Sequence, residues 1–253
     1  MLKDFLSPED FINYPPCGMF TLGHILSFVV CMILMVTLLY VSYKKDNLNI
    51  KKITKIVAIV LAVLEALKIV YHVYYSYLKL EQIIPLSYCS LFIYALFMSG
   101  FGKGKVEKIG NSFITGGCIV AGSAFLIFPT TSLMLHPLFH ALSIHSMLYH
   151  TTMVFFGILF FMKKVERVSI NNFIYYSIFT ISFLILAIIL NLSFDGNLMF
   201  IQKPMNMPFD FINKVFEKVP FIYTLATCIM YESIYFVPLI VKVIKNKTQE
   251  KRA

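Results

Sequence analysis

Residues 53–78 read ITKIVAIVLAVLEALKIVYHVYYSYL, a long apolar run that carries ionisable residues in its interior. An α-helix of about 20 residues crosses a hydrocarbon core about 30 Å thick, because each residue adds about 1.5 Å. Six other apolar segments of spanning length lie near residues 20–43, 83–101, 111–134, 137–162, 170–193 and 219–243. The sequence therefore predicts an all-α polytopic membrane protein, a bundle of seven transmembrane helices that forms one domain over residues 1–253.

The composition excludes a soluble globular domain and gives no indication of a metal or a cofactor. Hydrophobic residues make up 58% of the 253 residues, charged residues only 14%, and the mean hydropathy is +0.77. Such a composition does not describe a water-exposed surface. The five cysteines form neither a CxxC pair nor a disulfide framework. We therefore expect a membrane protein that binds no metal and no cofactor.

The basic residues alternate from one connection to the next. Sixteen of them lie in the connections on one side of the predicted bundle, and five lie on the other side. Because cytoplasmic loops carry the excess of lysine and arginine, this asymmetry predicts an outside N-terminus and a cytoplasmic C-terminus in the cell membrane. Contact with anionic lipid explains the net charge of +9 without a nucleic acid. Frequent lysine with only two arginines suggests a bacterial source.

Ionisable residues inside the predicted spans need a partner or a function. A charge at the bilayer centre costs roughly 2.5 to 3.5 kcal/mol on insertion scales. Glu65, Lys68 and His72 share one helix face, and they form either a self-neutralising pair that fixes packing or a group that handles substrate or protons. Glu232 has no opposite charge within its own turn. Counting from the basic loops places Glu65 and Glu232 at one depth, about 15 Å in, so we expect both to face a common polar cavity.

Four of the six histidines lie between residues 136 and 150, but they do not share one helix face. His136 and His140 lie at the outer helix end, where wetting by headgroups is a simpler interpretation than metal binding because no third ligand is evident. His145 is expected to bond to a neighbouring helix. His150 lies deepest, and it is either a general acid or base or a packing histidine.

Cys89 in the stretch PLSYCS lies at about the same depth as His150 when residues are counted from the basic loops. A lone cysteine in a helix is usually a small apolar side chain. Pro85, however, lies four residues earlier and can open the helix toward a cavity. An imidazole at the same depth can activate a thiol to a thiolate, which is the arrangement used in covalent acyl transfer.

The segment FDFINKVFEKV at residues 209–219 alternates apolar and charged residues at helical spacing. Phe209, Ile212 and Phe216 fall on one side of such a helix, and the charged residues fall elsewhere. This pattern predicts a short interfacial helix on the outer leaflet.

Three stretches resemble a known family. EALKIVYHVYYSYLKLEQIIPLSYCSLFIY is similar to the glutamate-bearing helix and cysteine segment of YwaF-type bacterial integral membrane proteins. MLYHTTMVFFGILFF resembles the segment with that family's membrane histidine, and NLSFDGNLMFIQKP resembles its asparagine signature. YwaF-type proteins look related to the eukaryotic transmembrane protein 164 family, which is implicated in moving acyl chains between phospholipids. The resemblance implies that Cys89 is the nucleophile and His150 the base.

The expected function is therefore a membrane-embedded acyltransferase or lipid-modifying enzyme that acts on phospholipid acyl chains. Asn191 and Asn197 are expected either to cap the sixth span or to bind a lipid headgroup. The alternatives are a proton-coupled carrier with Glu65, Lys68, His72 and Glu232 as its relay, and a non-catalytic scaffold or sensor. An odd number of spans without a visible repeat is unlike many carriers.

Overall fold

The regular elements of the described chain are helices. The computed structural model describes residues 5–8, 15–45, 47–204 and 210–250. Its helices are α2 (Leu22–Lys44), α3 (Ile50–Tyr74), α4 (Leu80–Ile83), α5 (Leu91–Phe101), α6 (Lys105–Ile127), α7 (Ala141–Met162), α8 (Ile170–Phe194), the 3₁₀ helix η2 (Leu198–Phe200), α9 (Asp210–Lys218), α10 (Pro220–Ser233) and α11 (Phe236–Glu250). The prediction of an all-α fold is confirmed for these residues.

Four helices in the described part of the chain, α2, α6, α7 and α8, are both long and apolar enough to cross a membrane. The pair α10 and α11 is bent by 40° and adds a fifth span if it crosses as one unit. The helix α3 has 25 residues, which corresponds to about 37 Å, but its apolar run is interrupted by charged residues. Four to five spans are thus supported, and the expected number of seven is not confirmed.

The third expected span, 83–101, is not a continuous helix. The short helix α4 ends at Ile83, residues 84–90 are irregular, and α5 has only 11 residues. Pro85 explains the break, because proline lacks a backbone N–H and pushes the residue before it out of the helical region. Ile84 accordingly has extended dihedral angles, with φ −97° and ψ 114°. This break places Cys89 in a turn ahead of α5 rather than inside a helix.

Two other helices have ends that differ from the predicted spans, and a nearby proline or a capping side chain accounts for the difference. The span predicted at 111–134 is the helix α6, which begins at Lys105 and ends at Ile127, just before Pro129. The span predicted at 137–162 begins only at Ala141, because the side chain of His140 caps that helix by accepting a hydrogen bond from the backbone N–H of Leu142.

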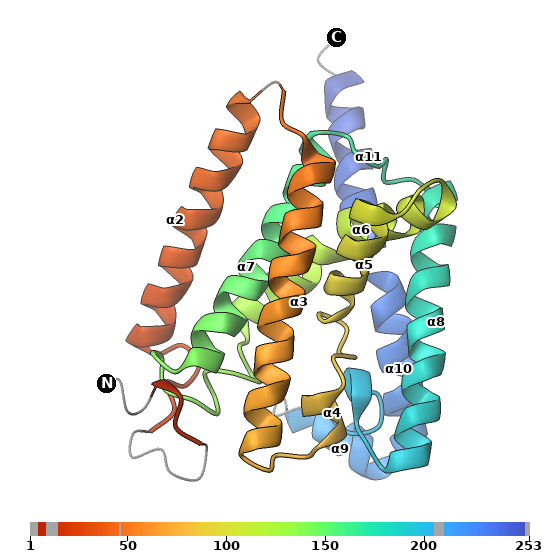
Figure 1. Ribbon diagram of the computed structural model, residues 1–253. Coiled ribbons are helices and arrows are strands. Elements are labelled where there is room, and N and C mark those ends of the chain that lie inside the picture. Colours follow the sequence, from red (N-terminus) through yellow and green to blue (C-terminus); the bar gives the residue numbers. More distant parts are fainter. Residues whose placement is uncertain (1–4, 9–14, 46, 205–209, 251–253) are drawn as a thin grey trace.

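The antiparallel helices α6 and α7 pack closely through small residues. A Cβ atom added at Gly122 would lie 3.0 Å from the carbonyl oxygen of His150, and one added at Gly157 would lie 3.0 Å from the backbone nitrogen of Ile119. Glycine therefore permits the close approach of the two backbones, as in many membrane helix pairs. Figure 1 shows α2 on the outside of this pair, with α3 in front and α8 on the opposite flank.

The basic connections gather at one end of the bundle, which is the upper end in Figure 1. Lys163 Nζ donates to the carbonyl oxygens of Tyr43 and Lys45, so the α2–α3 and α7–α8 connections are in contact. Lys51 and Glu107 form an ion pair of 2.8 Å, which joins the start of α6 to the start of α3 at the same end of the bundle. The loops that the charge pattern assigned to one side of the membrane therefore lie together.

The opposite end carries α4, the loop after α8 and α9 (Figure 1). The helix α9 covers most of the segment predicted as an interfacial helix, and Phe216 packs its ring 5.7 Å from that of Tyr223 at the start of α10. Phe209, which the prediction also placed on the apolar side, lies outside the described residues.

Candidate functional site

Cys89 lies in a tight turn that is tied to α7. The hydroxyl of Tyr149 donates a hydrogen bond of 2.9 Å to the carbonyl oxygen of Cys89, which also accepts from the backbone N–H of Phe92 at 3.0 Å. The same turn is braced by a bond of 2.8 Å between the hydroxyls of Ser87 and Ser90. These contacts fix the half-buried thiol at the point where α5 begins.

Cys89 directly precedes the first turn of α5. The first backbone N–H groups of this helix already have partners, because Leu91 donates to the carbonyl oxygen of Ser87 and Phe92 donates to that of Cys89. The helix dipole is positive at this end, which favours an anion, whereas burial of the thiol disfavours its ionisation. Sequence reasoning placed Cys89 inside a helical span and could not show that it stands just before the start of a helix.

Buried tyrosines surround this turn, and sequence reasoning missed them. The rings of Tyr88 and Tyr231 stack with centroids 4.6 Å apart, and the hydroxyls of Tyr88 and Tyr176 are 2.5 Å apart. Tyr176 also donates to the carbonyl oxygen of Tyr231 at 2.5 Å. A buried tyrosine hydroxyl needs a hydrogen-bond partner. The tyrosines inside the apolar segments of the sequence could therefore have indicated this hydrogen-bonded cluster.

His150 is held in one orientation by its own helix and by α6. Its Nδ1 is 2.7 Å from the carbonyl oxygen of Ser146, and its ring stacks on Phe125 with centroids 3.5 Å apart. Because a carbonyl oxygen only accepts hydrogen bonds, Nδ1 carries the proton in the neutral ring and the lone pair lies on Nε2. A neutral imidazole of this kind can accept a proton at Nε2.

No hydrogen bond joins Cys89 to His150 among the described residues, and the link between them is indirect. Tyr149, which holds the Cys89 turn, is the residue next to His150. Tyr149 thus links the turn of Cys89 to α7, and the predicted catalytic pair stays a prediction.

The polar face of α3 contains a buried ion pair. Glu65 Oε1 lies 2.5 Å from Lys68 Nζ, although the geometry is not that of a hydrogen bond. Glu65 and His72 are both buried, with 6% of each residue exposed. His145 on α7 lies within electrostatic range of both charges. The expected pair of Glu65 and Lys68 is present, whereas the bond predicted from His145 to a neighbouring helix is absent, since its Nε2 has no partner within the described chain.

Glu232 on α10 is bonded to α8. Its Oε2 accepts a hydrogen bond of 2.6 Å from the hydroxyl of Ser177, and its Oε1 accepts one from the hydroxyl of Thr180. The partner that Glu232 needed therefore comes from another helix. Glu65 binds Lys68 instead, so the two acids have separate partners and their common cavity stays a prediction.

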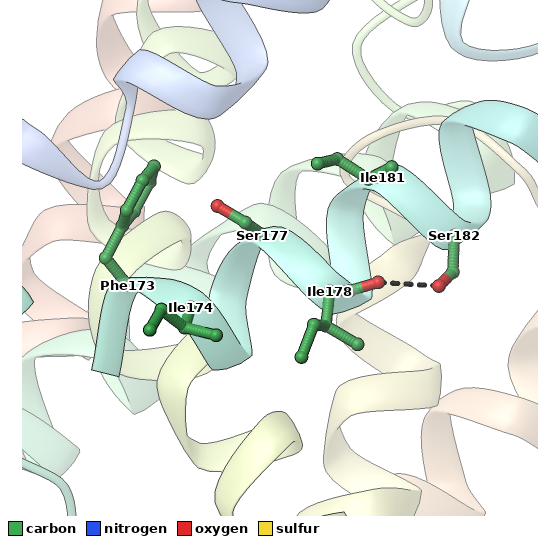
Figure 2. A pocket seen from close by; sticks show the side chains of 6 residues that line it. All are labelled: Phe173, Ile174, Ser177, Ile178, Ile181 and Ser182. Atoms are coloured by element: carbon green, nitrogen blue, oxygen red, sulfur yellow. Dashed lines mark hydrogen bonds between the residues drawn. The ribbon is translucent and has the colours of Figure 1, made fainter. Parts of the chain in front are cut away.

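A shallow groove of about 410 Å³ lies on α8 beside this carboxylate. Figure 2 shows that its lining side chains come from a single helix: Phe173, Ile174, Ser177, Ile178, Ile181 and Ser182. The hydroxyl of Ser182 donates a hydrogen bond of 2.6 Å to the carbonyl oxygen of Ile178. The groove is one exposed helix face without converging reactive groups, and it is not the candidate site.

Asn191 and Asn197 fold the loop after α8. The amide of Asn191 accepts from the N–H of Leu198 at 2.7 Å and donates to its carbonyl oxygen at 3.0 Å. Asn197 accepts from the N–H groups of Gln202 and Lys203 and donates to the carbonyl oxygen of Lys203. Both side chains thus bond to the backbone of the loop, whereas the C-cap of α8 is Asp195, so they hold the loop rather than cap the helix end. Headgroup binding by these residues stays a prediction.

His136 and His140 are not wetted by headgroups, and that prediction is wrong. They are 2% and 1% exposed, and their rings stack with centroids 4.4 Å apart. His140 Nε2 is 3.0 Å from the carbonyl oxygen of Ser7, so the N-terminal segment covers them. Burial, together with the nearby His140 and His72, lowers the pKa of His136 to about 3. Within the described residues, no group of three histidine, cysteine or acidic side chains could hold a metal.

The comparisons with known proteins agree with the helical membrane architecture. The model of the TMEM164 family matches residues 19–237, which include Cys89, His150, the α3 ion pair and the loop after α8. Comparison with curated proteins gave no match, and comparison with solved structures gave none either. A relation to YwaF-type bacterial proteins is consistent with this family. Because the match covers most of the sequence, the chain belongs to the TMEM164 family.

Proposed function

We propose that the protein is a membrane-embedded acyltransferase that moves acyl chains between phospholipids, with Cys89 as nucleophile and His150 as base. One observation carries the proposal: the Tyr149 hydroxyl holds the Cys89 carbonyl, and the next residue on α7 is a buried histidine whose Nε2 has a free lone pair. A cysteine thiol that gives its proton to a neutral imidazole is the chemistry of covalent acyl transfer.

The reaction has two steps. In the first, His150 Nε2 takes the proton of the Cys89 thiol, the thiolate attacks an ester carbonyl, and the departing lipid alkoxide takes the proton back. In the second, a hydroxyl of another lipid gives its proton to His150 and attacks the thioester, which restores the Cys89 thiol. Proton transfer requires Sγ and Nε2 to approach to about 3 to 4 Å in the productive state.

The proposed topology has seven crossings with the N-terminus outside and the C-terminus in the cytoplasm. The helix α3 and the broken unit of α4 and α5 supply the two crossings beyond the bent pair and the four long apolar helices. A half-helix that starts inside the bilayer is compatible with a membrane protein when its irregular backbone is buried in protein. The chain then acts on lipids of the cell membrane.

The test uses purified protein in nanodiscs that contain a phospholipid with a labelled acyl chain and an unlabelled lysophospholipid. The wild type should transfer the label to the lysophospholipid. Cys89→Ala should abolish transfer, because the nucleophile is lost, and His150→Gln should slow it by about 10² to 10⁴. Mass spectrometry should detect an acyl thioester on Cys89 that is missing in Cys89→Ala.

Cys228→Ala is the matched control, because Cys228 is also half-buried but lies on α10. This variant should transfer acyl chains as fast as the wild type. Undiminished transfer by Cys89→Ala would exclude the covalent mechanism, and the absence of transfer by folded wild type with every lipid pair tried would favour a scaffold or sensor.

A further inference from the structure

Two buried imidazole nitrogens between α3 and α7 have no hydrogen-bond partner among the described residues. They are Nδ1 of His72, a residue that is 94% buried, and Nε2 of His145. A buried polar atom without a partner costs about 1 to 3 kcal/mol, and native proteins retain few of them without a reason. Two such atoms in one region point to a polar ligand that completes their hydrogen bonds.

The two imidazoles flank the ion pair of α3. Both histidines are within electrostatic range of Glu65 and of Lys68. The Lys68 ammonium, whose side chain is 24% exposed, has three N–H donors, and within the described residues its ion-pair partner is the Glu65 carboxylate. Lys68, His72 and His145 thus provide three nitrogen groups near Glu65 that could bind the oxygens of a phosphate.

Two tyrosines also interact with Glu65. Tyr94 on α5 and Tyr149 on α7 are both within electrostatic range of the Glu65 carboxylate. Tyrosine faces and a carboxylate together are the usual surroundings of a bound ammonium group, because the ring quadrupole attracts a cation. The region therefore has a cation-binding part next to an anion-binding part.

We propose that Glu65, Lys68, His72 and His145 bind the zwitterionic headgroup of a phospholipid, with its phosphate at Lys68 and the imidazoles and its ammonium at Glu65. The inference deepens the proposed function and rests on it for the identification of the ligand as a phospholipid. The Glu65–Lys68 pair supplies both charges of this site, and the headgroup would replace the present partner of each charge.

Charge balance selects this ligand class over a purely anionic headgroup. The pair carries no net charge, and a phosphocholine or phosphoethanolamine group carries none either, so binding leaves no uncompensated charge in the bundle. Three residues of helix separate Glu65 and Lys68 by about 4.5 Å along the axis, which suits the two-carbon linker between phosphate and ammonium. An anionic headgroup would satisfy Lys68 but leave the Glu65 carboxylate unpaired.

Tyr149 connects the proposed headgroup site to the turn of Cys89. Tyr149 contacts the Cys89 carbonyl and belongs to the Glu65 surroundings, so one residue connects the two regions. A phospholipid held by its headgroup would bring its ester bonds toward the turn that carries Cys89.

The test measures lipid binding to delipidated protein by native mass spectrometry. Phosphatidylcholine and phosphatidylethanolamine should bind at least about tenfold more tightly than phosphatidylglycerol, which is a difference of about 1.4 kcal/mol. In the double variant Glu65→Lys and Lys68→Glu this preference should disappear, because the pair is kept but its direction is reversed. Glycerophosphocholine, which has no acyl chains, should bind more weakly than the lipid, and equal binding would overturn the assignment to a lipid.

Two controls separate the headgroup site from charge effects and from catalysis. Exchanging the exposed pair, with Lys51→Glu and Glu107→Lys, should leave the lipid preference unchanged. Cys89→Ala should also bind lipids as the wild type does. If transfer depends on Cys89 but the wild type shows no preference for zwitterionic lipids, the headgroup site alone is overturned. If the wild type shows that preference but transfer does not depend on Cys89, the proposed function alone is overturned.

A second variant covers the case in which the exchanged pair does not fold. His145→Phe removes an unpartnered nitrogen and keeps a ring of similar size, so the empty protein should remain folded. It should bind phosphatidylcholine several-fold more weakly than the wild type, because the phosphate loses one donor. Unchanged affinity in this variant would show that His145 does not contact a headgroup and would overturn the site as drawn here.

Discussion

Single side chains decide how this chain satisfies polar groups inside the bilayer. Asn191 holds both backbone groups of Leu198, Glu232 accepts from two hydroxyls on α8, and the Tyr149 hydroxyl holds the Cys89 carbonyl. An unsatisfied group at these positions has no water to replace the lost partner, so each contact contributes more than an exposed one does.

Asn191→Ala should destabilise the protein by about 2 to 4 kcal/mol. The side chain is 1% exposed, and its removal leaves the N–H and the carbonyl of Leu198 without these partners. Thermal unfolding in detergent measures the effect. Asn171→Ala, at an exposed position of the same helix, should change stability by less than about 0.5 kcal/mol. Similar losses in both variants would contradict the structural role of Asn191.

Helix packing depends on where the sequence permits close approach and where it prevents regular structure. Glycines allow α6 and α7 to touch, and Pro85 divides the third apolar segment into two pieces. The missing side chains of the glycines thus allow the close packing at the centre of the bundle. The restricted backbone of Pro85 produces the turn that carries Cys89.

Gly157→Ala should separate α6 from α7 and lower stability by about 1 to 3 kcal/mol. The added Cβ would lie 3.0 Å from the backbone nitrogen of Ile119, which cannot move without its helix. Ser182→Ala on the exposed face of α8 is the comparison, because its hydroxyl bonds only to its own helix. Denaturation in mixed micelles reports both changes, and a stable Gly157→Ala protein would show that the helix contact is looser than described.

The whole molecule has two chemically different ends. Contacts such as Lys163 with the α2–α3 connection hold the basic loops together, and the other end carries α4 and the loop that follows α8. Because cytoplasmic loops usually carry the excess of basic residues, we predict that the end with the basic loops faces the cytoplasm.

Labelling of introduced cysteines tests this orientation. In a Cys17→Ala background, Lys79→Cys should react with a membrane-impermeant maleimide in intact cells, and Lys105→Cys should react only after the cells are opened. Both lysines are exposed, so accessibility to the reagent depends on the side of the membrane. A reporter fused after Ala253 should be active in the cytoplasm alone. Reaction of Lys105→Cys in intact cells would reverse the topology.

The sequence by itself determined the helical membrane class and the polar positions. Apolar length and charge content are local properties, and they identified the helix that carries Glu65 and Lys68 and the pair that these residues form. The family resemblance singled out Cys89 and His150 before any fold was known. Pro85 also indicated from the sequence that the helix is disturbed there, but the sequence did not show how many residues would be non-helical.

Only the tertiary structure decided which distant groups meet. The bond between Tyr149 and Cys89 joins positions 60 residues apart, and Glu232 finds partners more than 50 residues away. His136 and His140 were misjudged because their burial depends on the N-terminal segment, which contacts His140 across 133 residues. The periodicity of a sequence shows which face of a helix is polar. Which residues contact that face depends on how distant segments pack together, and no local sequence pattern shows this.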